Sequence, residues 1–455
     1  MGVADGSPYN VVVKELRRAT SLLMAQLRGD LERLVRIPSI AFPGFPETPL
    51  QTAGAALVEL LSDAGLADAR LLEVPGAPPC VYAHRPALHG APTVMLYAHY
   101  DVQPAGDEAL WTTAPFEPVE RDGRLYGRGV ADDKSGIVMH LGVLRLLGAD
   151  CPVGIKVLLE GKEECGEGEL DAFVSANPEL ASADVLFIAD ALNYVLGVPT
   201  LTTSLRGIIN MEIEVRALED AVHSGCFGGV APDALVALIR MLATLHDPQG
   251  NVAVDGLTTI AYDGAPYDEA DFREHASVLP GVDLIGEGTI CERLSVRPSI
   301  SFHGLDAPAV DGAANALVPQ ARALVGVRIA PDQHPREAIA AVTRHLEAVR
   351  PWNVRLNVRS RMIGEGYLGR TDGPAYAVAR SALESAFGRP AVLLGHGYAL
   401  PLVAAYARAV PDAEIIQFGA MEPLCRVHGI DESLDLAELE RCVLAEAVFL
   451  SRLGS

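Results

Sequence analysis

Hydrophobic residues in the first part of the chain follow two spacings. A helical period covers Val11–Val35, and helical stretches recur near residues 52–64, 135–147 and 167–176. Runs of strand length that are apolar at nearly every position lie between them, at Arg70–Val74, Cys80–His84, Thr93–Ala98, Gly154–Glu160 and Ala183–Asp190. Because strands that are apolar on both faces and separated by helices are typical of buried parallel sheets, this part predicts an α/β layer.

The pattern changes after residue 207. In Ile209–Val215, apolar residues alternate with polar ones, which indicates a strand with one face in water. The elements predicted after it are a helix, two strands, a helix and a strand, at Asp233–Leu245, Pro298–His303, Ala321–Ile329, Pro335–Val349 and Val354–Arg361. The order β-α-β-β-α-β predicts a ferredoxin-like α+β domain, interrupted by a loop-rich insert at residues 250–293.

The α/β rhythm returns from about Asp372 to the end of the chain. Its predicted elements are a helix, strand, helix, strand and helix, at Ala375–Phe387, Ala391–Leu394, Leu402–Ala409, Glu414–Phe418 and Leu436–Leu450. We therefore expect an α/β domain built from residues 1–207 and 367–455, with a central, mostly parallel sheet flanked by helices. The α+β domain, residues 208–366, is inserted between these two parts.

Composition narrows the class of protein. Of 455 residues, 49% are hydrophobic and 21% are charged, which suits a globular chain with large cores. The formal net charge of −23 repels phosphate backbones, so we expect no nucleic-acid partner. The N-terminal residues lack a signal-peptide pattern, and no apolar run is long enough to span a membrane. The seven scattered cysteines without a CxxC pair indicate reduced thiols, and we predict a cytoplasmic location.

Candidate chemistry begins where predicted strands end. His99 and Asp101 follow one strand, in YAHYDVQP, where a histidine can bind a metal with a carboxylate behind it. A histidine that merely caps the strand end is the alternative. Asp132 and Asp133 follow a glycine-rich turn and precede a helix, where an aspartate can equally serve as the N-cap.

Further acidic residues and a second histidine follow. Glu163 and Glu164 come directly after a strand, Asp190 ends another, and His428 lies in the returning α/β segment. Each alone could be a solvated polar residue. Together with His99 and Asp132, they supply the imidazoles and carboxylates that two neighbouring divalent cations require. Mixed ligands of this kind suit zinc, with cobalt or manganese as alternatives.

Several ordered motifs resemble those of one zinc-dependent metallopeptidase family. They are YAHYDVQP, WTTAPFEP, LYGRGVADDKSG, the Glu163–Glu164 pair, Asp190, SLRG, VHSGCFGG and His428 with Asp431–Glu432. The family includes carnosinases, bacterial dipeptidases, aminoacylases and succinyl-diaminopimelate desuccinylase. The carnosinase and cytosolic dipeptidase branch is the most similar, and the likeness covers nearly the whole chain.

The resemblance implies a role for each candidate residue. His99 and Asp190 would hold one zinc ion, Glu164 and His428 a second, and Asp132 would bridge both. Asp101 would orient His99, and Glu163 would be the general base. His223, from the inserted lid and dimerisation domain, would stabilise the oxyanion in the active site of a dimer mate, and Arg328 would bind the substrate carboxylate. The implied assembly is a homodimer with two zinc ions per subunit.

The chain departs from the family pattern where the substrate would bind. In GHGYALPL, Tyr398 and Ala399 stand where the carnosinase-like branch has glycine and serine, and Ala316 stands where threonine is frequent. The leading hypothesis is a di-zinc metallopeptidase that cleaves dipeptides or similar short substrates. Two alternatives stay open: a deacylase of N-acyl amino acids or a specialised amidase of the same family, and a non-catalytic binding module.

Overall fold

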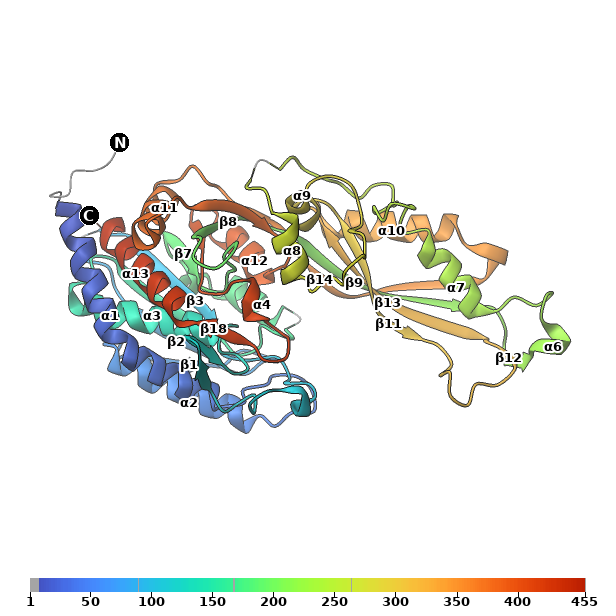
Figure 1. The fold of residues 1–455 in the computed structure, drawn as a ribbon, viewed down its shortest axis with the longest axis horizontal. Helices are drawn as coiled ribbons and strands as arrows, with labels where there is room; N and C mark the ends of the chain where they lie inside the picture. The colour runs from blue at the N-terminus through green and yellow to red at the C-terminus, as the bar shows by residue number, and fades with distance from the viewer. Residues whose placement is uncertain (1–7, 89, 167, 263, 455) are drawn as a thin grey trace. The chain divides into compact units, whose positions relative to one another are not determined.

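A computed structural model describes residues 8–88, 90–166, 168–262 and 264–454 (Figure 1). The chain divides into two compact units. The first unit comprises Met1–Thr203, Gly369–Leu394 and Ala405–Ser455, and the second comprises Ser204–Leu368 and Gly395–Ala404. The predicted domain boundaries at residues 207 and 366, and the roles of lid and dimerisation domain, stay predictions.

A six-stranded sheet forms the centre of the first unit, in the order β1-β2-β6-β3-β7-β17. Its strands are β1 (Arg70–Leu72), β2 (Cys80–Arg85), β3 (Thr93–His99), β6 (Gly154–Glu160), β7 (Val185–Ile188) and β17 (Glu414–Gln417). From β6 to β17 every neighbouring pair is parallel, whereas β1 and β2 form an antiparallel edge. The parallel strands are almost wholly buried, as their continuous apolar runs predict.

The helices of the first unit are α1 (Pro8–Val35), α2 (Thr48–Asp63), α3 (Lys134–Leu147), α4 (Glu169–Ala176), α5 (Pro178–Ala181), α11 (Pro374–Phe387) and α13 (Leu436–Leu453). Helix α12 (Pro401–Ala409) begins among residues of the second unit and ends among residues of the first. Helices α1, α3 and α13 pack against one another, and α3 also packs on β3 (Figure 1). The Asp133 carboxylate caps α3 by accepting a hydrogen bond from the backbone N–H of Gly136. Glu167, in the predicted helix 167–176, lies outside the described residues, as do residues 1–7 of the segment considered for a signal peptide.

The second unit is built on an antiparallel sheet in the order β11-β13-β9-β14. Its strands and main helices are β9 (Gly207–Arg216), α7 (Ala234–Ala243), β11 (Ser299–Asp306), β13 (Gln320–Ile329), α10 (Pro335–Ala348) and β14 (Arg355–Gly364). Their order along the chain is the predicted β-α-β-β-α-β. Residues of β9 alternate between buried and part-exposed, and α7 buries residues three or four positions apart. The predicted fold class, an α/β domain with an inserted α+β domain, is confirmed.

Shorter elements escaped the hydrophobic pattern because few residues define each. They are β4 (Val119–Arg121), β5 (Arg124–Tyr126), β8 (Thr200–Leu205), β10 (Val222–His223), α6 (Ser224–Phe227), α8 (Glu269–His275), α9 (Ile290–Ser295), β12 (Ala316–Leu317), β15 (Tyr367–Leu368) and β18 (Ser433–Asp435). The strand predicted at Ala391–Leu394, in contrast, is present as β16 (Val392–His396). The insert expected to be loop-rich therefore contains two short helices, α8 and α9. Among the described residues, no helix combines the length and the apolar character needed to cross a bilayer.

Substitution of Phe187 tests the packing of the first unit's hydrophobic core. Its ring is fully buried in β7 and meets the rings of His140, Phe418 and Phe449 at centroid distances of 5.7, 4.6 and 5.8 Å. We expect Phe187→Ala to lower the free energy of unfolding by about 3–5 kcal/mol, because it removes apolar contacts and leaves a cavity. Denaturant unfolding measures the change. Leu22→Ala, at a residue 76% exposed on α1, is the control and should change it by less than about 0.5 kcal/mol.

Candidate metal centre

Parallel strands bring the candidate residues to one edge of the sheet. His99 is the last residue of β3, Glu163 and Glu164 follow the end of β6, and Asp190 lies two residues beyond β7. Because β6, β3 and β7 are adjacent and parallel, their carboxyl ends meet at the same edge. This is where open α/β sheets bind their ligands.

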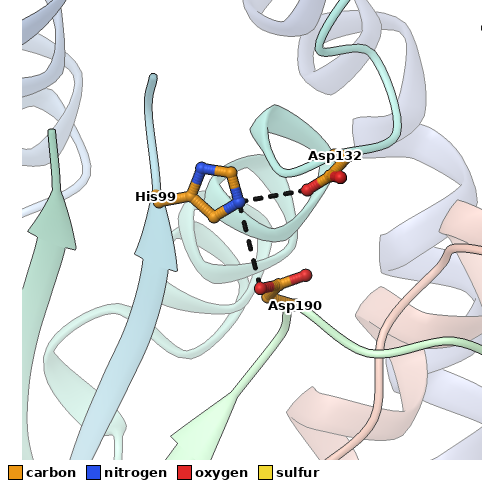
Figure 2. A group of neighbouring side chains, drawn as sticks. All are labelled: His99, Asp132 and Asp190. Atoms are coloured by element: carbon orange, nitrogen blue, oxygen red, sulfur yellow. Dashed lines mark hydrogen bonds and ion pairs between the residues drawn. The ribbon is translucent and has the colours of Figure 1, made fainter. Parts of the chain in front are cut away.

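The first group of metal-binding side chains consists of His99, Asp132 and Asp190 (Figure 2). The His99 Nε2 atom lies 3.0 Å from Asp132 Oδ1 and 3.9 Å from Asp190 Oδ2. Ligand atoms around one tetrahedral zinc ion are separated by about 3.3 Å, given bonds of about 2.0–2.2 Å. The three side chains are therefore spaced as ligands of a single cation.

The second group consists of Asp132, Glu164 and His428. The His428 Nε2 atom lies 3.0 Å from Asp132 Oδ2 and 3.2 Å from Glu164 Oε2. Asp132 therefore belongs to both groups and presents a different carboxylate oxygen to each histidine. A carboxylate shared in this way is the bridge that a two-metal site requires.

Asp101 is fully buried and holds the glutamate pair. Its two carboxylate oxygens accept hydrogen bonds from the backbone N–H groups of Glu163 and Glu164, at 3.0 and 3.1 Å. Its Oδ1 atom also lies 3.4 Å from His99 Nδ1, and the Asp101 carbonyl oxygen lies 3.1 Å from the same atom. The carboxylate thus lies next to the Nδ1 side of the His99 ring, as the sequence motif predicts. It also holds the loop that follows β6.

Glu432 and Asp133 were not singled out as site residues, although Glu432 stands in a quoted motif. The buried Glu432 carboxylate accepts hydrogen bonds from the backbone N–H groups of Gly129, Ala131 and Asp132, at 3.1, 3.0 and 3.2 Å. It also pairs with Arg128 at 2.7 Å. Asp133 accepts a hydrogen bond from the His99 backbone N–H. Both residues fix ligand-bearing loops. The sequence signal for Glu432 was an acidic residue within a quoted motif, and the signal for Asp133 was its expected role as a helix N-cap.

The electrostatics of the site favour a bound cation. Burial and the neighbouring Asp132 raise the pKa of Asp190 to about 7. Burial, together with Asp190 and Glu164, raises the pKa of Glu163 well above its usual range. Hydrogen bonds to Asp132 and Glu164 raise the pKa of His428 to about 10. Bound protons thus reduce the negative charge of these crowded carboxylates. Divalent cations bound to the same oxygen and nitrogen atoms would reduce it in the same way.

His223 and Arg328 belong to the second unit. His223 ends β10, is exposed, and accepts a hydrogen bond from the Gly225 backbone N–H through Nδ1, which caps α6. Arg328 lies in β13, where burial lowers the pKa of its guanidinium. Their predicted roles at the oxyanion and at the substrate carboxylate stay predictions.

Imidazole and carboxylate ligands gathered in two adjoining groups at a sheet edge define a metallohydrolase site. The chain matches Peptidase family M20/M25/M40 over residues 95–452 and belongs to that family. The predicted family is therefore confirmed, and so is the class of enzyme, a hydrolase of the metallopeptidase type.

Named relatives lie in the same branch. The chain is 40% identical to a cysteinylglycine-S-conjugate dipeptidase of Corynebacterium striatum over 373 residues, which cover 80% of this chain and 82% of the relative. It is 29% identical to a Beta-Ala-His dipeptidase of Rattus norvegicus over 347 residues, 71% and 70% of the two chains. The structure of human carnosine dipeptidase 1 shares the fold, with a TM-score of 0.84 at 24% identity, over 97% of this chain and 99% of that one.

The raised pKa values predict how pH affects the metal-free protein. The folded Asp190 carboxyl has a pKa of about 7 against an ordinary 3.8, so the unfolded chain releases this proton first as pH rises. Stability that depends on it falls between about pH 4 and 7. Folding raises the pKa of His428 from 6.5 to about 10, so the stability that its protonated form contributes is lost between these two pH values. We expect the Tm of the chelated protein to fall from about pH 5 to 8.

Zinc should raise the Tm more at about pH 8 than at about pH 5, because the cation competes with protons for the same ligands. Differential scanning fluorimetry with and without added metal measures both effects. Asp190→Asn removes one of the titrating groups and should flatten the pH dependence of the metal-free protein. A metal-induced shift that is equal at both pH values would contradict this account of the site.

Proposed function

We propose that this chain is a di-zinc dipeptidase that hydrolyses the amide bond of short peptides. The observation that carries the proposal is the sharing of Asp132 between two ligand groups, with Glu163 beside them. The names of the relatives support a dipeptide substrate, because one is a cysteinylglycine-S-conjugate dipeptidase and another a Beta-Ala-His dipeptidase.

Five side chains would hold the metal ions. We assign His99 and Asp190 to one ion, Glu164 and His428 to the other, and Asp132 to both. Zinc suits this mixture of imidazole and carboxylate ligands, and cobalt or manganese could replace it. When bound, the cations supply Lewis-acid chemistry that polarises a carbonyl group and lowers the pKa of water.

Glu163 would act as the general base and then the general acid. Its carboxylate belongs to neither ligand group, so it stays free to exchange a proton. Burial and the nearby Asp190 raise its pKa, which makes the carboxylate a stronger base for a proton from water. The protonated form can then donate that proton to the leaving amine. Asp101, through hydrogen bonds to the backbone of Glu163 and Glu164, would keep both side chains in register with His99.

The second unit would contribute substrate contacts. We propose that Arg328 binds the substrate carboxylate and that His223 stabilises the oxyanion in a homodimer, acting on the partner's site. The exposed position of His223, with Nδ1 engaged by Gly225, leaves Nε2 available to donate a hydrogen bond. The seven free cysteines support a reducing, cytoplasmic location.

The central test is Glu163→Gln. We expect a loss of turnover of about 10²–10⁴-fold on a panel of dipeptides, because the amide cannot accept the proton. Metal content, measured by elemental analysis, should stay that of the wild type. Glu117→Gln, at an exposed residue, is the matched control and should keep full activity.

The same panel should include N-acyl amino acids. Deacylation without any dipeptide turnover by the wild-type enzyme would replace this proposal with the deacylase alternative. Wild-type turnover by Glu163→Gln would remove Glu163 from the role of base.

A subunit-exchange experiment tests His223. Separately, His223→Ala and Glu163→Gln should each be inactive. If His223 acts across a dimer, each mixed dimer contains one complete site. Random exchange should then restore about a quarter of the wild-type activity. Mixtures that stay inactive while size-exclusion chromatography shows exchanged dimers would rule out the trans arrangement.

A further inference from the structure

One pocket is lined entirely by residues of the second unit, many of them in the insert that carries α8 and α9. Its volume is about 480 Å³, within the range of about 300–1,000 Å³ typical of small-molecule sites. Apolar side chains make most of its wall, among them Phe272, Val278, Val282, Leu284, Ile285 and Ile290. Val282 and Ile285 are 50% and 68% exposed, so a ligand could still remove apolar surface from water.

Charged residues of the pocket wall are mainly positive. Three arginines, Arg206, Arg293 and Arg297, line it against a single acid, Asp283. This excess opposes the net charge of the chain, which is −23. The charge of the pocket wall is therefore opposite in sign to the charge of the whole chain.

Arg206 is buried, and no carboxylate of the described residues forms an ion pair with it. Its Nη1 atom donates to the carbonyl oxygens of Arg293 and Arg297, at 3.3 and 3.1 Å, and to Ser299 Oγ at 3.1 Å. Burial, followed by the nearby positive charge of Arg328, lowers its pKa to about 9. Carbonyl and hydroxyl oxygens orient the guanidinium, but these neutral acceptors do not cancel its positive charge.

The other two arginines extend this arrangement. Arg293 donates to backbone carbonyl oxygens, including that of Ile285 at 2.6 Å. The Arg297 Nε atom is buried and has no hydrogen-bond partner among the described residues. A buried donor without an acceptor costs free energy that an anionic ligand would recover.

We propose that this pocket binds a small amphipathic carboxylate. The anionic group would lie against Arg206 and Arg297, and the apolar body would fill the wall formed by Phe272, Leu284 and Ile285. This site goes beyond the proposed peptidase function, because its lining includes none of the residues assigned to the metal ions, to the general base or to substrate contacts.

Isothermal titration of the metal-loaded, full-length protein tests the proposal with two probes, decanoate and decyltrimethylammonium, which share an apolar tail and carry opposite charge. We expect saturable binding of decanoate and none of the cation. Arg297→Gln should weaken decanoate binding at least about tenfold, because a charge-assisted hydrogen bond is lost. Arg350→Gln, at an exposed arginine outside the pocket, should bind like the wild type.

A second pair of variants separates the pocket from general surface effects. Ile285→Asp places a negative charge in the wall, whereas Leu279→Asp places one on a side chain that is 71% exposed and does not line the pocket. We expect only Ile285→Asp to weaken decanoate binding. Equal effects of the two variants, equal binding of both probes, or decanoate binding that disappears when the metal is chelated and survives Arg297→Gln would overturn the proposal.

Discussion

Repulsion among buried carboxylates is the constraint on which the site depends. Asp132, Glu164 and Asp190 lie at one sheet edge, and the close contacts to His99 and His428 supply only part of the balancing charge. Such a cluster is stable only if backbone donors, protons or cations compensate it. Backbone N–H groups hold the loops in place. Protons compensate the negative charge in the metal-free protein, and divalent ions would compensate it in the metal-bound protein.

The loops that carry these ligands are tied together by other carboxylates. Asp101 connects the end of β3 to the loop after β6, and Glu432 connects the segment of His428 to the loop of Asp132. Each connection consists of backbone N–H donors that would otherwise be buried without partners. The geometry at the cations is therefore a property of the surrounding loops as much as of the ligands themselves.

The parallel layer could be predicted because its strands are apolar at nearly every position, and the strand ends then place His99 and Asp190 at one edge. The contacts of Glu432 could not, because they depend on how two loops about 300 residues apart meet. The backbone of the segment around His428 was also difficult to predict. Arg426, His428 and Asp431 all have positive φ, and none of them is a glycine, the residue that usually signals this conformation. Nor does hydrophobic spacing reveal helices as short as α8 and α9.

The net charge of the chain does not show how charge is distributed between the candidate sites. The first unit places several carboxylates where cations fit, while the second unit places three arginines around an apolar pocket. A net charge of −23 argues against binding a long polyanion, since such a ligand meets the field of the whole surface. It does not argue against a small anion, because a partly buried guanidinium acts over a few ångströms in a medium that screens it weakly.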